Sequence, residues 1–271
     1  MRSIDHKVHD LGYMDTLSRQ DTAIHRLDPR AKLLATLFFV GTVVSFDRYA
    51  LSALVPFLAY PLFLIAAGRI PASYILRKIA WVSPFAVLLG AFNPLLDRET
   101  LLTLGGVPLS GGWVSFLSIL LRFVLTVGAA LTLIAVTGFH AVCGGLRSLG
   151  VPRVLVVQLL FLHRYLFVLL DEATRMVRAR ALRSNGRRGQ GIGSWGSLVG
   201  HLALRTLDRA QRIHLAMRSR GFDGEIRCPA EGSWGWPEAS FLAGWLLFLV
   251  VCRIVNIPLV LGGLVQGGWG G

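Results

Sequence analysis

The stretch Trp113–Phe139, WVSFLSILLRFVLTVGAALTLIAVTGF, decides the fold class of this chain, because its only charged residue is Arg122. A helix of about 20 apolar residues crosses the roughly 30 Å of hydrocarbon in a bilayer. Further apolar runs lie on both sides of this stretch, and hydrophobic residues make up 54% of the chain. The sequence therefore predicts an all-α polytopic membrane protein and excludes a soluble globular fold.

Five membrane-spanning helices are expected when the neighbouring apolar runs are added to this stretch. Asp28 and Pro29 precede the first run, and an aspartate caps a helix start well while proline suits the first helical position. Pro56 and Pro61 fall inside the second run and are expected to bend it. The expected spans are 33–46, 50–68, 79–96, 113–139 and 239–264.

The distribution of basic residues predicts the orientation of these spans. Arg69, Arg77 and Lys78 cluster between the second and third spans, whereas Arg98 is the only base in the glycine-rich loop 97–112. Basic loops stay on the cytoplasmic side, so this loop is expected outside and the N-terminus inside. The same rule explains the net charge of +13, since no aromatic-interleaved basic groove indicates nucleic-acid binding.

The run 154–170 is also apolar, but it continues directly into a very basic segment. A crossing here would place about a dozen arginines of 171–230 outside, against the positive-inside rule. We therefore expect 151–186 to form a long helix that lies at the cytoplasmic surface. A flexible linker at 187–194 and a second surface helix at 195–220 are expected to follow it.

The expected second surface helix is amphipathic. Arg205, Arg209 and Arg212 form a basic stripe that is expected to meet solvent or lipid headgroups. In the first surface helix, Glu172 is expected to pair with Arg175 on one helix face. The apolar face of the second helix consists of residues at helical spacing, namely Val199, Leu202, Ala203, Ala210, Ile213 and Met217.

The end of each surface helix carries the same short pattern. It reads Ala181-Leu182-Arg183-Ser184-Asn185-Gly186 in the first helix and Ala216-Met217-Arg218-Ser219-Arg220-Gly221 in the second. Arginine offers five N–H donors in a rigid fork that holds a carboxylate bidentately, and glycine commonly follows a helix end. The pattern predicts two arginine tips that grip a soluble acidic partner. A coincidence of Arg/Gly-rich cytoplasmic loops is the alternative.

No catalytic, cofactor-binding or metal site is expected in this chain. The candidate spans contain no Asp or Glu, and the phosphate-binding sequence GxxxxGK[ST] is absent. Cys143, Cys228 and Cys252 lack the spacing of a zinc site, and His6 and His9 lack a convincing third ligand. Any ATP hydrolysis must therefore come from partner proteins.

Two arginines lie near membrane depth, Arg122 in the fourth expected span and Arg253 in the last. An unpaired cation is costly in hydrocarbon, so each side chain is expected to face protein or water. A structural pairing or snorkelling to the interface is one explanation of these residues. A direct role in transport is the other explanation.

Several of these features together resemble a known family. They are Asp28-Pro29-Arg30-Ala31-Lys32, Leu149-Gly150-Val151-Pro152, Phe161, Arg164-Tyr165, Glu172 and the paired arginine motifs. The chain resembles the T component of energy-coupling factor (ECF) transporters, EcfT, and most of all the cobalt-type member, CbiQ. The second motif, Ser219-Arg220-Gly221, is similar to the family's Ala-Arg-Gly signature. The first motif has Asn185 where the family usually has Arg, so Arg183 is the expected substitute.

The resemblance implies a non-catalytic scaffold in an ATP-driven importer of the bacterial inner membrane. Such a scaffold joins two ABC-type ATPases, which use the ATP, to a separate substrate-capturing (S) subunit, here one similar to CbiM, with or without a small accessory membrane subunit. Cobalt uptake for cobalamin biosynthesis is the implied role. A nickel or vitamin importer, or a stand-alone channel or secondary transporter, is the alternative. The implied ATPase-coupling residues are Arg183, Ser184, Asn185, Gly186, Arg218, Ser219, Arg220 and Gly221.

These inferences divide the chain into four segments. Residues 1–32 are expected to form an N-terminal cytoplasmic segment, and 33–140 the first four spans. Residues 141–237 are expected to hold the cytoplasmic coupling helices with both arginine motifs. Residues 238–271 are expected to hold the last span and the C-terminus of this multi-pass protein.

Overall fold

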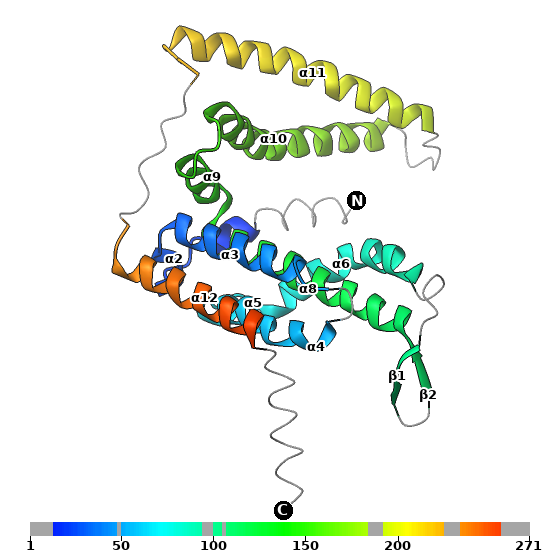
Figure 1. The fold of residues 1–271 in the computed structure, drawn as a ribbon. Coiled ribbons are helices and arrows are strands. Elements are labelled where there is room, and N and C mark those ends of the chain that lie inside the picture. Colours follow the sequence, from blue (N-terminus) through cyan, green and yellow to red (C-terminus); the bar gives the residue numbers. More distant parts are fainter. Residues whose placement is uncertain are drawn as a thin grey trace, which may run out of the picture. The chain divides into compact units, whose positions relative to one another are not determined.

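Almost all of the described chain is helical, which confirms the predicted all-α class (Figure 1). Two compact units make up the chain: Asp15–Gly145 with Glu231–Gly271, and Met1–Met14 with Leu146–Ala230. The predicted boundaries between the four segments stay a prediction. The computed structural model describes residues 13–47, 50–93, 100–104, 107–183, 192–224 and 234–255.

The unit that contains Asp15–Gly145 consists of helices and a short antiparallel hairpin. In chain order its described elements are α2 (Ala23–Arg26), α3 (Pro29–Val44), α4 (Leu51–Leu54), the 3₁₀-helix η1 (Val55–Leu58), α5 (Ala59–Ala67), α6 (Ala72–Ala91), β1 (Thr100–Leu104), β2 (Val107–Ser110), α8 (Gly111–Thr137), most of α9 (Phe139–Ser148) and α12 (Trp236–Ile254). Helix α8 packs against α3, α5 and α6, and α12 packs against α3. The stretch that decided the fold class is therefore the central helix of this unit.

An aromatic cluster joins three of these helices. The ring of Tyr60 stacks on Phe39 with centroids 4.6 Å apart, and Trp245 meets Tyr60 edge-on at 4.7 Å. The hydroxyls of Tyr60 and Thr36 share a hydrogen bond of 2.6 Å, which satisfies a phenol that is almost fully buried. These contacts tie α5 to α3 and α12, because stacked and edge-on rings add to the burial of apolar area.

The start of α3 follows the predicted capping rule. Asp28 Oδ1 accepts a hydrogen bond of 2.8 Å from the backbone N–H of Arg30, and Pro29 occupies the first helical position. Lys32 is buried, and its ammonium donates to the carbonyl oxygen of Ile24 at 3.2 Å and to that of the next residue at 3.4 Å. The sequence Asp-Pro-Arg-Ala-Lys thus begins α3 and also holds the short helix α2 that precedes it.

The second predicted span is interrupted at its prolines, as expected. Pro56 lies in the 3₁₀-helix η1, between α4 and α5, and Pro61 lies in the first turn of α5. Proline has no N–H to donate, so it is tolerated where the helix changes type or begins. The apolar stretch Leu51–Ala67 is consequently made of three short pieces.

Two predictions about the next segment are wrong in detail. Helix α6 begins at Ala72 rather than at 79, so Arg77 and Lys78 lie within it. A helix can begin before the apolar run that marks a membrane span, because polar residues also form helices. The ammonium of Lys78 lies 5.3 Å from the ring centre of Tyr74, one turn earlier. The glycine-rich segment predicted as a loop contains the antiparallel pair β1 and β2. Gly105-Gly106 between the two strands is a typical hairpin sequence, and this signal was overlooked.

Length and composition identify four described helices that can cross a membrane: α6, α8, α12 and α10 (Arg153–Arg183). Helix α3 has 16 residues, about 24 Å at 1.5 Å per residue, which is shorter than the usual span. Helix α10 meets the criteria although it was predicted to lie at the surface. Length and hydropathy alone do not distinguish a spanning helix from a surface helix. The basic C-terminal half of α10 favours the surface position, because basic segments stay on the cytoplasmic side.

Arg122 and Arg253, the two arginines near membrane depth, both contact the short segment that follows α3. Arg122 donates to the carbonyl oxygen of Asp47, and Arg253 donates at 3.4 Å to both the carbonyl and the hydroxyl oxygen of Ser45. The guanidinium of Arg253 also lies 4.4 Å from the ring centre of Phe46. Both guanidinium groups thus have backbone acceptors, and Arg253 lies at the C-cap of α3, where a cation is favourable. These contacts support the structural explanation of both residues.

Candidate functional site: the two helices that carry the arginine motifs

The unit that contains Leu146–Ala230 is built on two long helices, α10 (Arg153–Arg183) and α11 (Ile192–Ser219), which pack against each other. Both helices were predicted, with ends that differ by a few residues. Helix α10 begins directly after Pro152, which suits a helix start. Residues 192–194, predicted as part of a linker, belong to α11, and the rest of that linker lies outside the described residues.

The second arginine motif ends α11 with a well-defined turn. The carbonyl oxygen of Met217 accepts from the N–H of Phe222 at 3.0 Å, and that of Arg218 accepts from Gly221 at 3.0 Å. This pair of bonds is the Schellman arrangement, which requires a left-handed residue after the helix. Gly221 has φ +79°, so the predicted role of glycine in ending the helix is confirmed.

The turn fixes the position of the arginine tip. Arg218 and Arg220 are exposed on either side of the last helical residue, Ser219, whose hydroxyl donates to a carbonyl one turn earlier at 3.1 Å. Among the described residues neither arginine forms an ion pair. The chain then continues into Phe222, whose ring lies 6.4 Å from that of Phe161 on α10, centroid to centroid. An apolar contact beyond the glycine thus anchors the tip to the neighbouring helix.

The first motif is described only in part. Arg183 is the last residue of α10 and is exposed. Ser184, Asn185 and Gly186 lie outside the described residues, so the predicted helix cap at Gly186 stays a prediction.

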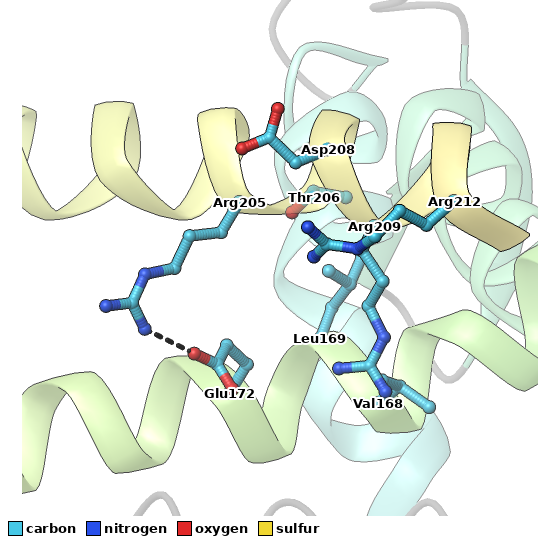
Figure 2. Close-up of a pocket in the computed structure, with 8 residues that line it drawn as sticks. All are labelled: Val168, Leu169, Glu172, Arg205, Thr206, Asp208, Arg209 and Arg212. Atoms are coloured by element: carbon cyan, nitrogen blue, oxygen red, sulfur yellow. Dashed lines mark hydrogen bonds and ion pairs between the residues drawn. The ribbon is translucent and has the colours of Figure 1, made fainter.

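An ion pair joins the two helices at mid-length, and its partners differ from the predicted ones. Glu172 Oε1 accepts from Arg205 at 2.7 Å across the gap between α10 and α11, as Figure 2 shows. Arg175, the predicted partner of Glu172, pairs with Asp171 on its own helix instead. Both carboxylates lie within one helical turn of Arg175, so spacing alone did not determine the choice.

The basic stripe of α11 is exposed, as predicted, and two of its arginines also extend toward α10. In Figure 2, Arg205 reaches down to Glu172, and Arg209 also extends from α11 toward α10, beside Val168. The direction of Arg205 and Arg209 toward α10 and the contact of Phe161 with Phe222 were not predicted. A signal for the packing of α10 on α11 was present in the sequence. Phe161, Tyr165 and Val168 recur at helical spacing along α10, which is typical of a face that packs on another helix.

Within the described ranges, no group of three or more His, Cys, Asp or Glu side chains is arranged to hold a metal ion. His6 and His9, the pair with metal-ligand spacing, lie outside the described residues. Cys143 and Cys252 are buried, and neither forms a disulfide bond among the described residues. The expectation that this chain has no metal or cofactor site therefore stays a prediction.

Comparison with known proteins identifies the family. The sequence profile of the cobalt transport protein family, CbiQ, matches residues 20–229, which include both arginine motifs. The chain belongs to this family. It is the transmembrane T component of an ECF transporter, a multi-pass and non-catalytic membrane subunit.

Individual relatives cover most of the chain at modest identity. The energy-coupling factor transporter transmembrane protein EcfT of Thermanaerovibrio acidaminovorans is 28% identical over 258 residues, covering 89% of this chain and 94% of that protein. EcfT of Listeria innocua is 26% identical over 216 residues, covering 74% and 81%. The cobalt transport protein CbiQ of Rhodobacter capsulatus is 34% identical over 84 residues, covering 31% and 34%.

Proposed function

We propose that this T component couples two ABC-type ATPases to a substrate-capturing membrane subunit through the ends of α10 and α11. The observation that carries the proposal is the capped end of α11, where Arg220 is exposed and has no ion-pair partner among the described residues. An exposed guanidinium next to a defined helix cap suits bidentate binding of a carboxylate on another protein.

The mechanism follows from the stiffness of the two helices. Helix α10 has 31 residues and α11 has 28, so each is more than 40 Å long, at about 1.5 Å per residue. A force applied at the arginine tip acts along the whole helix, and the Glu172–Arg205 pair links the two helices midway. When the ATPases close on ATP, we expect the tips at Arg183 and Arg220 to be drawn together and the helices to shift against each other.

Cobalt is the proposed substrate. The family profile that matches the chain is that of a cobalt transport protein, and this is what supports the assignment. Relatives named EcfT match a larger part of the chain than the relative named CbiQ, and this observation favours a second candidate, a T component for nickel or a vitamin. Uptake of radioactive cobalt, nickel and candidate vitamins by cells that express the whole complex distinguishes the two.

Charge reversal at the tip tests the coupling proposal. Arg220→Glu places a carboxylate against the acidic groove of an ATPase, and loss of one partner of a desolvated charge pair costs roughly 2–5 kcal/mol. That cost weakens the interface by about thirtyfold or more. The variant is therefore expected to lose the ATPases in a pull-down while it still inserts in the membrane.

A matched control and a double variant sharpen this test. Arg175→Ala removes an exposed arginine that pairs only within α10, so it should retain the ATPases. Arg183→Ala combined with Arg220→Ala should lose far more than either change alone, because each tip raises the effective concentration for the other. Full retention of the ATPases by the double variant contradicts the proposal.

Labelling of single cysteines tests the proposed orientation. In a cysteine-free background, cysteines in place of Gly191 and Ser233 should react only from the cytoplasm, and one in place of Ser110 only from outside. This pattern is expected because the basic residues of the α10–α11 unit stay on the cytoplasmic side, with the N-terminus. Reaction of position 191 from outside would show that α10 crosses the membrane.

A further inference from the structure

Among the cavities between α10 and α11, two share lining residues and differ in chemical character, while a third, of about 680 Å³, lies nearer Arg183. The larger of the two that share residues has a volume of about 330 Å³ and is lined mainly by apolar side chains from both helices. The residues that give it this character are Phe161, Tyr165, Val168, Ala210, Ile213 and Met217. Cavities of this size, about 300–1,000 Å³, typically hold a small ligand or part of one.

The second cavity, of about 290 Å³, is basic, and Figure 2 shows its lining. Arg205, Arg209 and Arg212 contribute three positive charges against the carboxylates of Glu172 and Asp208. Glu172 is already paired with Arg205. Among the described residues, neither Arg209 nor Arg212 forms an ion pair, so this cavity offers unneutralised guanidinium groups.

The two cavities adjoin each other, because they share four lining residues. Val168, Leu169, Thr206 and Arg209 line both, so the apolar space opens beside the cationic one. A ligand that fills both must carry an apolar chain next to an anionic group. A free phosphate would leave the apolar cavity unfilled, and a neutral hydrocarbon would leave the arginines unpaired.

We propose that the α10–α11 groove binds an anionic phospholipid, with an acyl chain in the apolar cavity and the phosphate at Arg209 and Arg212. Arginine is suited to this headgroup, because its planar fork binds phosphate oxygens bidentately. Basic residues on a membrane protein also attract the anionic lipids of the cytoplasmic leaflet. The site goes beyond the coupling function and does not depend on it.

The apolar surface of α10 supports a lipid over a soluble ligand. Its N-terminal half is apolar enough to meet the criteria for a membrane helix, yet little of it is buried. Val154, Leu155 and Leu162 are 67%, 50% and 64% exposed, and they lie beside or N-terminal to Phe161, the first residue of α10 that lines the apolar cavity. A lipid chain can therefore enter the groove along a helix that already suits contact with hydrocarbon.

Lipid retention measured by native mass spectrometry tests the proposal. The full-length protein is purified from nanodiscs that contain equal amounts of phosphatidylglycerol and phosphatidylcholine. One tightly bound phosphatidylglycerol per chain is expected to remain. Arg209→Gln combined with Arg212→Gln should weaken its retention by about tenfold or more, which corresponds to about 1.4 kcal/mol.

Two further variants separate the charge from the apolar cavity. Arg164→Gln also removes an exposed arginine from α10, but this residue lines neither cavity, so the variant should retain phosphatidylglycerol. Ala210→Trp keeps every charge and fills the apolar cavity, so it should lose the lipid. All of these positions are exposed, and thermal unfolding of each variant checks that the fold is intact.

Each alternative occupant has a distinct outcome. Displacement of phosphatidylglycerol by millimolar inorganic phosphate would overturn the proposal in favour of a simple anion site. Equal retention of phosphatidylcholine, or unchanged retention in the Arg209/Arg212 double variant, would overturn it as well. A photoactivatable phosphatidylglycerol should crosslink near Phe161 and Met217, and crosslinking of a protein partner there instead would contradict the lipid assignment.

Discussion

Replacement of Gly221 by alanine tests whether the cap of α11 positions the arginine tip. The residue has φ +79°, where an L-amino acid is disfavoured by roughly 1–2 kcal/mol. A Cβ atom added to Gly221 would meet no other atom within 4 Å, so there is no clash and the cost is that of the backbone conformation alone. A cost of about 1 kcal/mol raises the population of an open cap about fivefold.

The expected effect is local. The N–H groups of Gly221 and Phe222 lose their bonds to the last turn of α11 when the cap opens, and Arg220 loses its fixed position. Amide hydrogen exchange at 220–222 should therefore speed up about fivefold, for a cost of about 1 kcal/mol. Retention of the ATPases in a pull-down should fall only in proportion to the lost fraction of closed cap, so this decrease should be smaller than the change in exchange rate.

Gly200→Ala is the matched control. Gly200 lies on the same helix, and a Cβ atom there also meets no other atom within 4 Å. Its φ is not positive, so alanine should stabilise α11 by up to about 1 kcal/mol through its higher helix propensity. The reasoning is refuted if Gly221→Ala leaves both the exchange at 220–222 and ATPase retention unchanged.

Two further predictions concern the other unit. Burial and the nearby ammonium of Lys32 lower the pKa of His25 below its usual value of 6.5, so the folded state resists protonation of this ring. Stability of the N-terminal segment should accordingly fall as the pH drops below 6.5, and His25→Gln should remove the dependence, as measured by hydrogen exchange of 21–32 at pH 7.5 and 5.5. Equal pH dependence in the variant argues against this role. Arg69 has φ 49° at the end of α5, where glycine is preferred, so Arg69→Gly should stabilise the protein by about 1 kcal/mol. The unfolding midpoint in detergent is the measurement, and a lower midpoint contradicts the prediction.

The sequence alone determined the features that depend on neighbours along the chain. Long runs of high hydropathy predicted α8 and α12, because the ability of a helix to lie in hydrocarbon depends on the composition of that helix alone. Asp28 and Pro29 predicted the start of α3, and Gly221 predicted the end of α11, because a cap involves residues only a few positions apart. The family resemblance drew on the same local motifs.

Only the tertiary structure decided the contacts between segments that are distant in sequence. Glu172 had candidate partners on its own helix and pairs with Arg205, 33 residues later. Arg122 and Arg253 come from two different helices, and both contact residues 45–47, which follow α3. The direction in which Arg209 points, and the groove beside it, likewise depend on how α10 packs on α11. Helical periodicity places residues on a face, whereas packing alone determines which other element that face meets.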